Sequence, residues 1–244
     1  MVIAAHTPNP DDPQQQWHPL QAHLNKVARQ AAAFAAVIGA ERCGYYAGLW
    51  HDLGKYHPDF QAYLQACHGG DRTKSVPHAI HGAKLAFDYA ETEDLGILEP
   101  LALVIYGHHS GLHAYSDLED DMAGKDERKT TKAYETALKA ARDEQIEVKP
   151  EFSSQEFDKL NQFSNWQKEL FWRLLFSCLV DADHLDTEKH FHPEKAEQRQ
   201  NVASLQSLMA VFMAQQERFI NQLNDPHARL NQIRQEVYVS MKNC

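Results

Sequence analysis

Apolar residues recur every three or four positions along most of this chain, and this spacing places them on one face of a helix. No segment of the sequence shows the sustained alternation of apolar and polar residues that is typical of a half-buried strand. Gly and Pro interrupt the helical pattern at intervals, as they do between helices. The predicted helices cover about residues 19–39, 41–53, 59–67, 77–89, 100–107, 166–186 and 194–223, with a last helix from about 225. We therefore expect an all-α fold.

The segment between about residues 115 and 164 differs from the rest, since it is polar and mixed in charge. A helix is predicted within it over residues 129–144, and we interpret the segment as a solvated excursion or lid rather than as part of the core. Neither an internal repeat nor a low-complexity stretch divides the chain. One domain over residues 1–244 is therefore predicted, with a helical core at about 17–188 and C-terminal helices at 192–244.

The composition is that of a folded, acidic protein. With 43% apolar and 24% charged residues the chain has enough material for a sizeable core, which excludes a disordered or fibrous protein. No apolar run approaches the roughly 20 residues of a membrane span, and the N-terminus lacks the pattern of a signal peptide. We expect a cytoplasmic protein with no membrane partner. A formal charge of -10 argues against a protein that coats nucleic acid, although it does not exclude a local basic groove or a metal that offsets phosphate charge.

Histidine is the unusual component, with 15 residues, and one of them forms the dipeptide His51-Asp52 in the string GLWHDLGK. Apolar residues before the pair predict a buried helix face, and Gly54 after it predicts the helix end. This places an imidazole and a carboxylate where a core helix meets a cleft. Because neighbouring helical residues point about 100° apart, the two can bind different metal ions or approach one ion from different sides.

Three further histidine positions fit a helical cleft. His78 and His81 in VPHAIHGA are three residues apart and share a helix face, and the adjacent Gly82 allows another helix to pack closely. The pair His108-His109 falls at the end of a predicted helix. His23 lies on the apolar side of the first helix, where a hydrogen-bonded core histidine is the alternative to a ligand.

The helix predicted over residues 166–186 carries the closely spaced pair Asp181 and Asp183, and helical phase separates these two carboxylates. Asp183 continues the apolar stripe of this helix, whereas Asp181 lies well off it. A carboxylate aimed into an apolar stripe needs compensation, and metal ligation is a common form of it. Imidazole nitrogens together with carboxylate oxygens suit first-row transition metals better than Mg²⁺. The stripe comprises Trp172, Leu175, Phe176, Leu179 and Val180.

This order of His, His-Asp, further His and Asp on a helical background resembles the HD superfamily of metal-dependent phosphohydrolases. The local strings resemble one branch most, the HD nuclease domain of the CRISPR-associated nuclease-helicase of type I systems, over about residues 17–188. The strings that carry this resemblance are WHPLQAHLNKVA, AGLWHDLGKYHPDFQAYL, VPHAIHGA, YGHHSGL and LLFSCLVDADHLDTE.

The resemblance implies an HD-domain helical bundle with a metal-binding cleft that hydrolyses phosphodiester bonds of single-stranded DNA, as an endonuclease, an exonuclease or both. It implies one or two divalent transition-metal ions, with Mn, Co, Ni or Fe favoured over Mg. Asp52 is expected to bridge two ions, and Lys55 to contact a phosphate oxygen unless it is only a helix-terminal charge. His18 is a less favoured neighbour of the first ligand, and His81 leaves the assignment at His78 open. The implied ligands are His23, His51, Asp52, His78, His108, His109 and Asp183.

The resemblance also implies partners: single-stranded DNA, a helicase domain or separate helicase subunit, and the CRISPR RNA-guided surveillance complex. The last 22 residues resemble the segment that leads into the helicase, and no GxxxxGK[ST] phosphate loop follows. Either a stand-alone nuclease recruits a helicase, or this is an excised N-terminal domain, which the ending at the expected junction favours. Two other functions stay open: an HD phosphohydrolase acting on nucleotides or cyclic nucleotides, and a degenerate HD module that only scaffolds partners.

Overall fold

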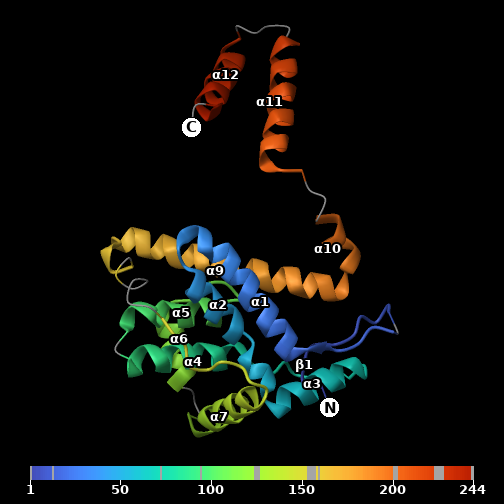
Figure 1. Ribbon diagram of the computed structural model, residues 1–244, viewed down its shortest axis with the longest axis vertical. Helices are drawn as coiled ribbons and strands as arrows, with labels where there is room; N and C mark the ends of the chain where they lie inside the picture. The colour runs from blue at the N-terminus through green and yellow to red at the C-terminus, as the bar shows by residue number, and fades with distance from the viewer. Residues whose placement is uncertain are drawn as a thin grey trace. The chain divides into compact units, whose positions relative to one another are not determined.

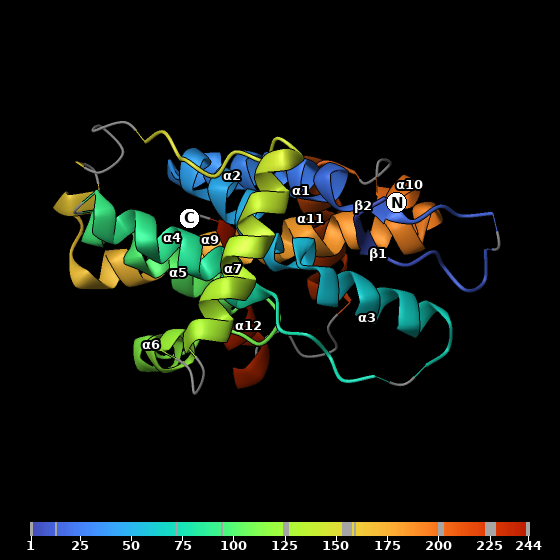
Figure 2. The same ribbon diagram turned by 90° about the horizontal axis from the view of Figure 1, so that it is seen from below.

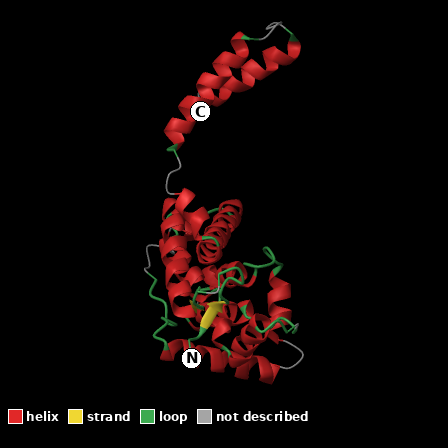
Figure 3. Ribbon diagram, turned by 90° about the vertical axis from the view of Figure 1, so that its right-hand side faces the viewer, coloured by secondary structure: helices red, strands yellow, loops and turns green. Residues whose placement is uncertain are grey.

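Helices form almost all of the regular structure, as the all-α prediction requires (Figure 3). The structure is a computed structural model, and it describes residues 2–12, 14–71, 73–93, 95–123, 127–152, 158, 160–199, 203–222 and 228–242. The chain divides into two compact units, residues 1–196 and 197–244. Among the described residues, no helix combines the length and the apolar character needed to cross a membrane.

The first unit contains the helices that carry the predicted ligands. Its α-helices are α1 (Leu20–Ala35), α2 (Glu41–Trp50), α3 (Pro58–His68), α4 (Ala79–Thr92), α5 (Glu99–Tyr106), α6 (Tyr115–Ala123), α7 (Glu127–Asp143) and α9 (Asn165–Phe191). Short 3-10 helices are η1 (Ala36–Ile38), η2 (Leu53–Tyr56) and η3 (Gly96–Leu98), and α10 (Pro193–Arg199) spans the unit boundary. Two short strands, β1 (Ala4–His6) and β2 (His18–Pro19), pair antiparallel and were not predicted.

Small residues let α1 and α2 pack at very short range beside α9 (Figure 1). A Cβ added at Gly44 would lie 2.6 Å from the Ala31 carbonyl oxygen, and one at Gly48 would lie 2.7 Å from the backbone of Ala28. The contacts run in opposite directions along the two helices. Because the two helices run antiparallel, the next contact in this series brings His51, which directly follows α2, beside His23 of α1.

A second close approach joins the end of α2 to α4 and α5. A Cβ at Gly82 of α4 would lie 1.9 Å from the Trp50 carbonyl oxygen and 3.2 Å from Ile105 Cγ2. This agrees with the close helix packing predicted at Gly82. Gly54 serves the same purpose on the other side, since a Cβ there would lie 2.3 Å from the His78 carbonyl oxygen.

The interpretation of residues 115–164 as a solvated excursion was wrong for helix α7. Tyr134, Ala137, Leu138 and Ala141 are buried members of the main core, and α7 packs against η2 (Figure 2). These four residues are spaced at i, i+3, i+4 and i+7, which is one helix face. The surrounding charged residues hid this stripe in a composition-based interpretation.

Several predicted helix boundaries also differ from the structure, two of them for a visible reason. The helix predicted over 41–53 ends at Trp50, and residues 53–56 form η2, because the chain must turn where Gly54 meets α4. The helix predicted over 194–223 is divided into α10 and α11 (Leu205–Asn221). Ser204 begins α11 as an N-cap, its hydroxyl accepting a hydrogen bond from the backbone N–H of Ser207 at 3.1 Å.

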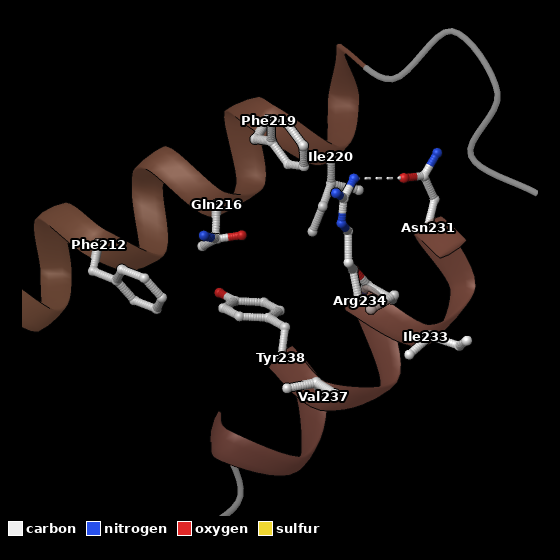
Figure 4. A pocket seen from close by; sticks show the side chains of 10 residues that line it. Phe212, Gln216, Phe219, Ile220, Asn231, Ile233, Arg234, Val237 and Tyr238 are labelled. Atoms are coloured by element: carbon white, nitrogen blue, oxygen red, sulfur yellow. Dashed lines mark hydrogen bonds between the residues drawn. The ribbon is translucent and has the colours of Figure 1, made fainter. Parts of the chain in front are cut away.

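The second unit includes α11 and α12 (Arg229–Lys242), whose side chains line a cavity of about 460 Å³ (Figure 4). Phe212 and Tyr238 face one another with ring centroids 6.5 Å apart. None of the predicted metal ligands lies in this unit. Residues 197–244 form a compact unit of their own by their contacts. The prediction of one domain over residues 1–244 stays a prediction.

We expect Gly82→Ala to lower the free energy of unfolding by about 1–3 kcal/mol or more, since the new methyl group would displace the end of α2 from α4. Urea denaturation followed by far-UV circular dichroism measures this loss. Gly69→Ala is the matched control, because its Cβ would meet its nearest neighbour at an ordinary 3.4 Å. Equal stability of the two variants would contradict the packing argument.

Candidate metal centre

All seven residues predicted as metal ligands lie in one continuous cluster within the first unit. Their segments are far apart in the sequence, and the packing of α1, α2, α4, α5 and α9 brings them together. The cluster consists of His23 on α1, His51 and Asp52 after α2, His78 before α4, His108 and His109 after α5, and Asp183 on α9. Metal ligation by these residues stays a prediction.

Four of the residues, His23, His51, Asp52 and Asp183, form what we call the inner group. His23 Nε2 lies 3.3 Å from His51 Nε2, and 3.4 Å from both Asp52 Oδ2 and Asp183 Oδ1. His51 Nε2 lies 3.3 Å from Asp52 Oδ2 and 3.6 Å from Asp183 Oδ1. Two imidazole nitrogens and two carboxylate oxygens therefore converge on one point.

The outer group consists of Asp52, His78, His108 and His109. Asp52 Oδ1 lies 3.1 Å from His78 Nε2 and 3.5 Å from His108 Nε2, and His78 Nε2 lies 2.8 Å from His109 Nε2. Asp52 belongs to both groups, with Oδ2 facing the inner group and Oδ1 facing the outer group. One carboxylate thus connects two sets of donor atoms.

The donor atoms fit transition-metal ions in both spacing and chemistry. Ligand atoms held about 2.1 Å from one ion at tetrahedral or octahedral angles lie about 3.0–3.4 Å apart, close to the distances within both groups. Both oxygens of Asp52 and Nε2 of His108 are buried and make no hydrogen bond. A buried polar atom without a partner is costly, and an ion at either group would satisfy these atoms.

Hydrogen bonds fix the imidazole rings so that Nε2 points into the cluster. The Nδ1–H of His51 donates to the Gly48 carbonyl oxygen at 2.8 Å, and that of His108 donates to the Ile105 carbonyl oxygen at 2.6 Å. His23 Nδ1 donates instead to Asp186 Oδ2 at 2.8 Å. These bonds leave the Nε2 lone pairs of the neutral rings available for metal ligation.

The pKa shifts within the inner group show that its carboxylates strongly stabilise positive charge. Burial by itself would lower the pKa of His23, but the nearby carboxylates of Asp183, Asp186 and Asp52 raise it to about 10. Burial likewise opposes the charged form of His51, yet Asp52 and Asp183 raise its pKa to about 9. Burial would raise the pKa of Asp52, but Lys55 and His51 hold it well below its ordinary value. A cation entering the inner group would replace the protons on these two histidines.

Lys55 is buried beside Asp52 instead of extending into solvent. Its Nζ lies 2.6 Å from Asp52 Oδ2, outside hydrogen-bond angles, and donates a hydrogen bond to the Ala5 carbonyl oxygen at 3.3 Å. The ammonium group also lies 5.6 Å from the centre of the Phe60 ring. Its position therefore suits the neutralisation of Asp52, while its predicted contact with a phosphate oxygen stays a prediction.

The structure separates the histidines that the sequence left as alternatives. His78 contacts Asp52, whereas His81 turns away and lies 3.3 Å from the His78 carbonyl oxygen through Nδ1. Burial lowers the pKa of His81 to about 4. His18 lies beside the cluster, with Nε2 3.4 Å from Asp186 Oδ2, and belongs to neither donor group.

The sequence interpretation assigns no role to Asp186, which lies directly behind His23. This residue is 2% exposed and holds His23, and Lys26 forms an ion pair with it. A signal was present, since Asp186 follows Asp183 by three residues on the same face of α9. The sequence interpretation assigns no role to His6 either, although its ring centroid lies 5.0 Å from that of His23.

The cluster is most exposed to solvent at its outer group. His23 and His51 are fully buried, and the side chain of Asp183 is 11% exposed. On the outer side, His78 is partly exposed and His109 is exposed, and both line a cavity of about 530 Å³. A molecule that approaches through this cavity therefore meets the outer group first.

Comparison with protein-family models identifies residues 8–191 as a match to the family described as Cas3, HD domain. The matched range includes both donor groups. No curated protein matches the chain.

We expect Asp186→Asn to weaken binding of Co²⁺ by about 10- to 100-fold, because the substitution removes the charge that orients His23 and raises its basicity. Isothermal titration calorimetry and the visible absorption of bound Co²⁺ measure the affinity. Asp181→Asn is the control, since Asp181 is exposed on the same helix. If both variants bind Co²⁺ equally well, Asp186 does not support a metal ligand.

Proposed function

The chain belongs to the family of Cas3 HD domains, which are metal-dependent phosphohydrolases of type I CRISPR systems, and we propose that it cuts single-stranded DNA during CRISPR interference. The observation that best supports a nuclease is the position of Asp52. It presents one oxygen to each of two donor groups, as a carboxylate that bridges two ions does.

In this proposal the protein holds divalent transition-metal ions through its two donor groups. His23, His51 and Asp183 would hold one ion, and the three outer histidines, His78, His108 and His109, a second. Bound there, the ions would supply an activated water and stabilise negative charge on the reacting phosphate. Lys55 keeps Asp52 ionised and in place from below.

The surroundings of the centre fit a substrate that is bound mainly by metal ions. The protein carries a formal charge of -10, so its body repels a phosphate backbone. We therefore expect modest and salt-sensitive affinity for DNA. Modest affinity for DNA favours delivery of the strand by a helicase, as a separate subunit or a further domain. In this proposal the delivery takes place at the RNA-guided surveillance complex in the cytoplasm.

Hydrolysis of nucleotides or cyclic nucleotides is the second candidate, and the cavity beside His78 and His109 favours it. Its volume of about 530 Å³ is typical of small-molecule sites. Parallel assays of one metal-loaded preparation on nucleotides and on oligonucleotides separate the two functions. Activity on nucleotides alone would overturn the nuclease proposal, and inactivity on both would favour a scaffolding module.

Asp52→Ala is expected to reduce metal-dependent cleavage of single-stranded DNA by at least about 100-fold, because both donor groups lose a ligand. A gel assay with a labelled oligonucleotide measures the rate, and circular dichroism verifies the helical fold. Asp59→Ala is the matched control, because that side chain is 78% exposed at the start of α3. Full activity of Asp52→Ala with unchanged metal content would refute the assignment.

Chelation should abolish cleavage, and added Mn²⁺, Co²⁺, Ni²⁺ or Fe²⁺ should restore it better than Mg²⁺. The reason is the donor set, since five imidazoles favour transition metals over a cation that prefers oxygen. Initial rates across a metal series, with bound metal measured by elemental analysis, test this order. Restoration by Mg²⁺ alone would contradict it.

A further inference from the structure

The cavity beside the outer group has a chemical character of its own. It is enclosed by the segment that leads into α4, by the residues that follow α5 and by Asp121 of α6. His78 and His109 form the part of its wall that belongs to the donor cluster. The inner group is largely buried, so a phosphate that reaches the cluster from this side leaves the rest of its substrate in the cavity.

The lining of the cavity does not suit a phosphate. No Lys or Arg is among the described residues that line it, whereas the carboxylate of Asp121 is. Tyr106 donates a hydrogen bond from its hydroxyl to that carboxylate, which holds the carboxylate at the cavity wall. With an acidic group and no described basic group in its lining, the cavity favours a neutral part of the substrate over a phosphodiester.

The lining does suit a flat ring with polar edges. The rings of Tyr106 and His113 lie 5.0 Å apart, and Val76, Pro77 and Ile80 add apolar surface. Ser110 Oγ and His113 Nε2, which lie 2.6 Å apart, add polar atoms to the lining that can hydrogen-bond to the edge of a base. Aromatic faces combined with a few hydrogen-bonding groups are the usual means of holding an unpaired base.

We propose that this cavity is a subsite for one unpaired nucleoside next to the scissile phosphate, with its base against Tyr106 and His113. The inference rests on the proposed nuclease function and deepens it. A base within a duplex is stacked and paired, so it would have to leave the helix to enter. A subsite of this kind would by itself make the protein prefer single-stranded over duplex DNA.

The test uses the full chain and short oligonucleotides with one cleavable phosphate between nuclease-resistant linkages. Removing the base on either side of that phosphate creates an abasic substrate. For one of the two sides, we expect the wild-type KM to rise by about 5- to 100-fold with little change in kcat, in line with the loss of one stacked base. His113→Ala should show a raised KM on the intact oligonucleotide and a much smaller abasic penalty.

Further variants separate binding from folding. Tyr106→Phe retains the ring and should keep the abasic penalty, whereas Tyr106→Ala should lose it. Trp166→Ala serves as the control, since it removes an aromatic side chain that is 82% exposed on α9. Metal content by elemental analysis should stay at the wild-type value in all of them.

The outcomes distinguish this inference from the function on which it rests. If the wild type cleaves intact and abasic oligonucleotides with the same KM, or if His113→Ala and Tyr106→Ala keep the full abasic penalty, the subsite is wrong and the nuclease function stands. If the wild type cleaves no oligonucleotide with any metal of the series, both are overturned.

Discussion

The buried carboxylate of Asp52 is the constraint around which the first unit is arranged. It is 1% exposed, and neither of its oxygens makes a hydrogen bond. An ionised carboxylate at such a site is tolerated only when positive charge or metal ions compensate it. Lys55 supplies one charge at 2.6 Å, and four histidine nitrogens lie within 3.1–3.5 Å of its oxygens. The same arrangement that makes the site costly in isolation makes it a strong binding place for cations.

Close helix packing makes this arrangement possible. Gly44 and Gly48 let α2 approach α1 until backbone atoms nearly touch, and Gly54 and Gly82 do the same between the end of α2 and α4. With larger residues at these positions the helices would stand further apart, and donor atoms spaced for one ion would separate. The glycines therefore contribute to the chemistry although none of them carries a functional group.

The two donor groups also differ in their access to solvent. The inner group can hold an ion away from solvent, while the outer group lies where a substrate can approach. The inner group is enclosed by α1, α2 and α9, with Asp186 fixing His23 from behind. The outer group faces a cavity through His78 and His109. Low solvent access on one side strengthens the electrostatics of the ligands, while access on the other side lets a phosphate approach.

Much of this could be predicted from the sequence, because helices have a local period. The all-α fold, most helix positions and the inward orientation of Asp183 follow from the spacing of apolar residues, and Asp183 is indeed buried while Asp181 is exposed. The family was also predicted correctly from short strings whose order along the chain is specific. Errors arose where charged neighbours masked an apolar stripe, as in α7, and where a helix end depends on a contact, as after Trp50.

Helical periodicity indicates on which helix face each candidate residue lies. The packing of separate helices is what directs the two oxygens of Asp52 to different groups, brings His78 rather than His81 into contact with it, and buries Lys55 beside it. Periodicity describes one helix at a time, whereas these distances depend on how closely and in which register separate helices pack. That information resides in contacts between segments far apart in the chain, and no local pattern contains it.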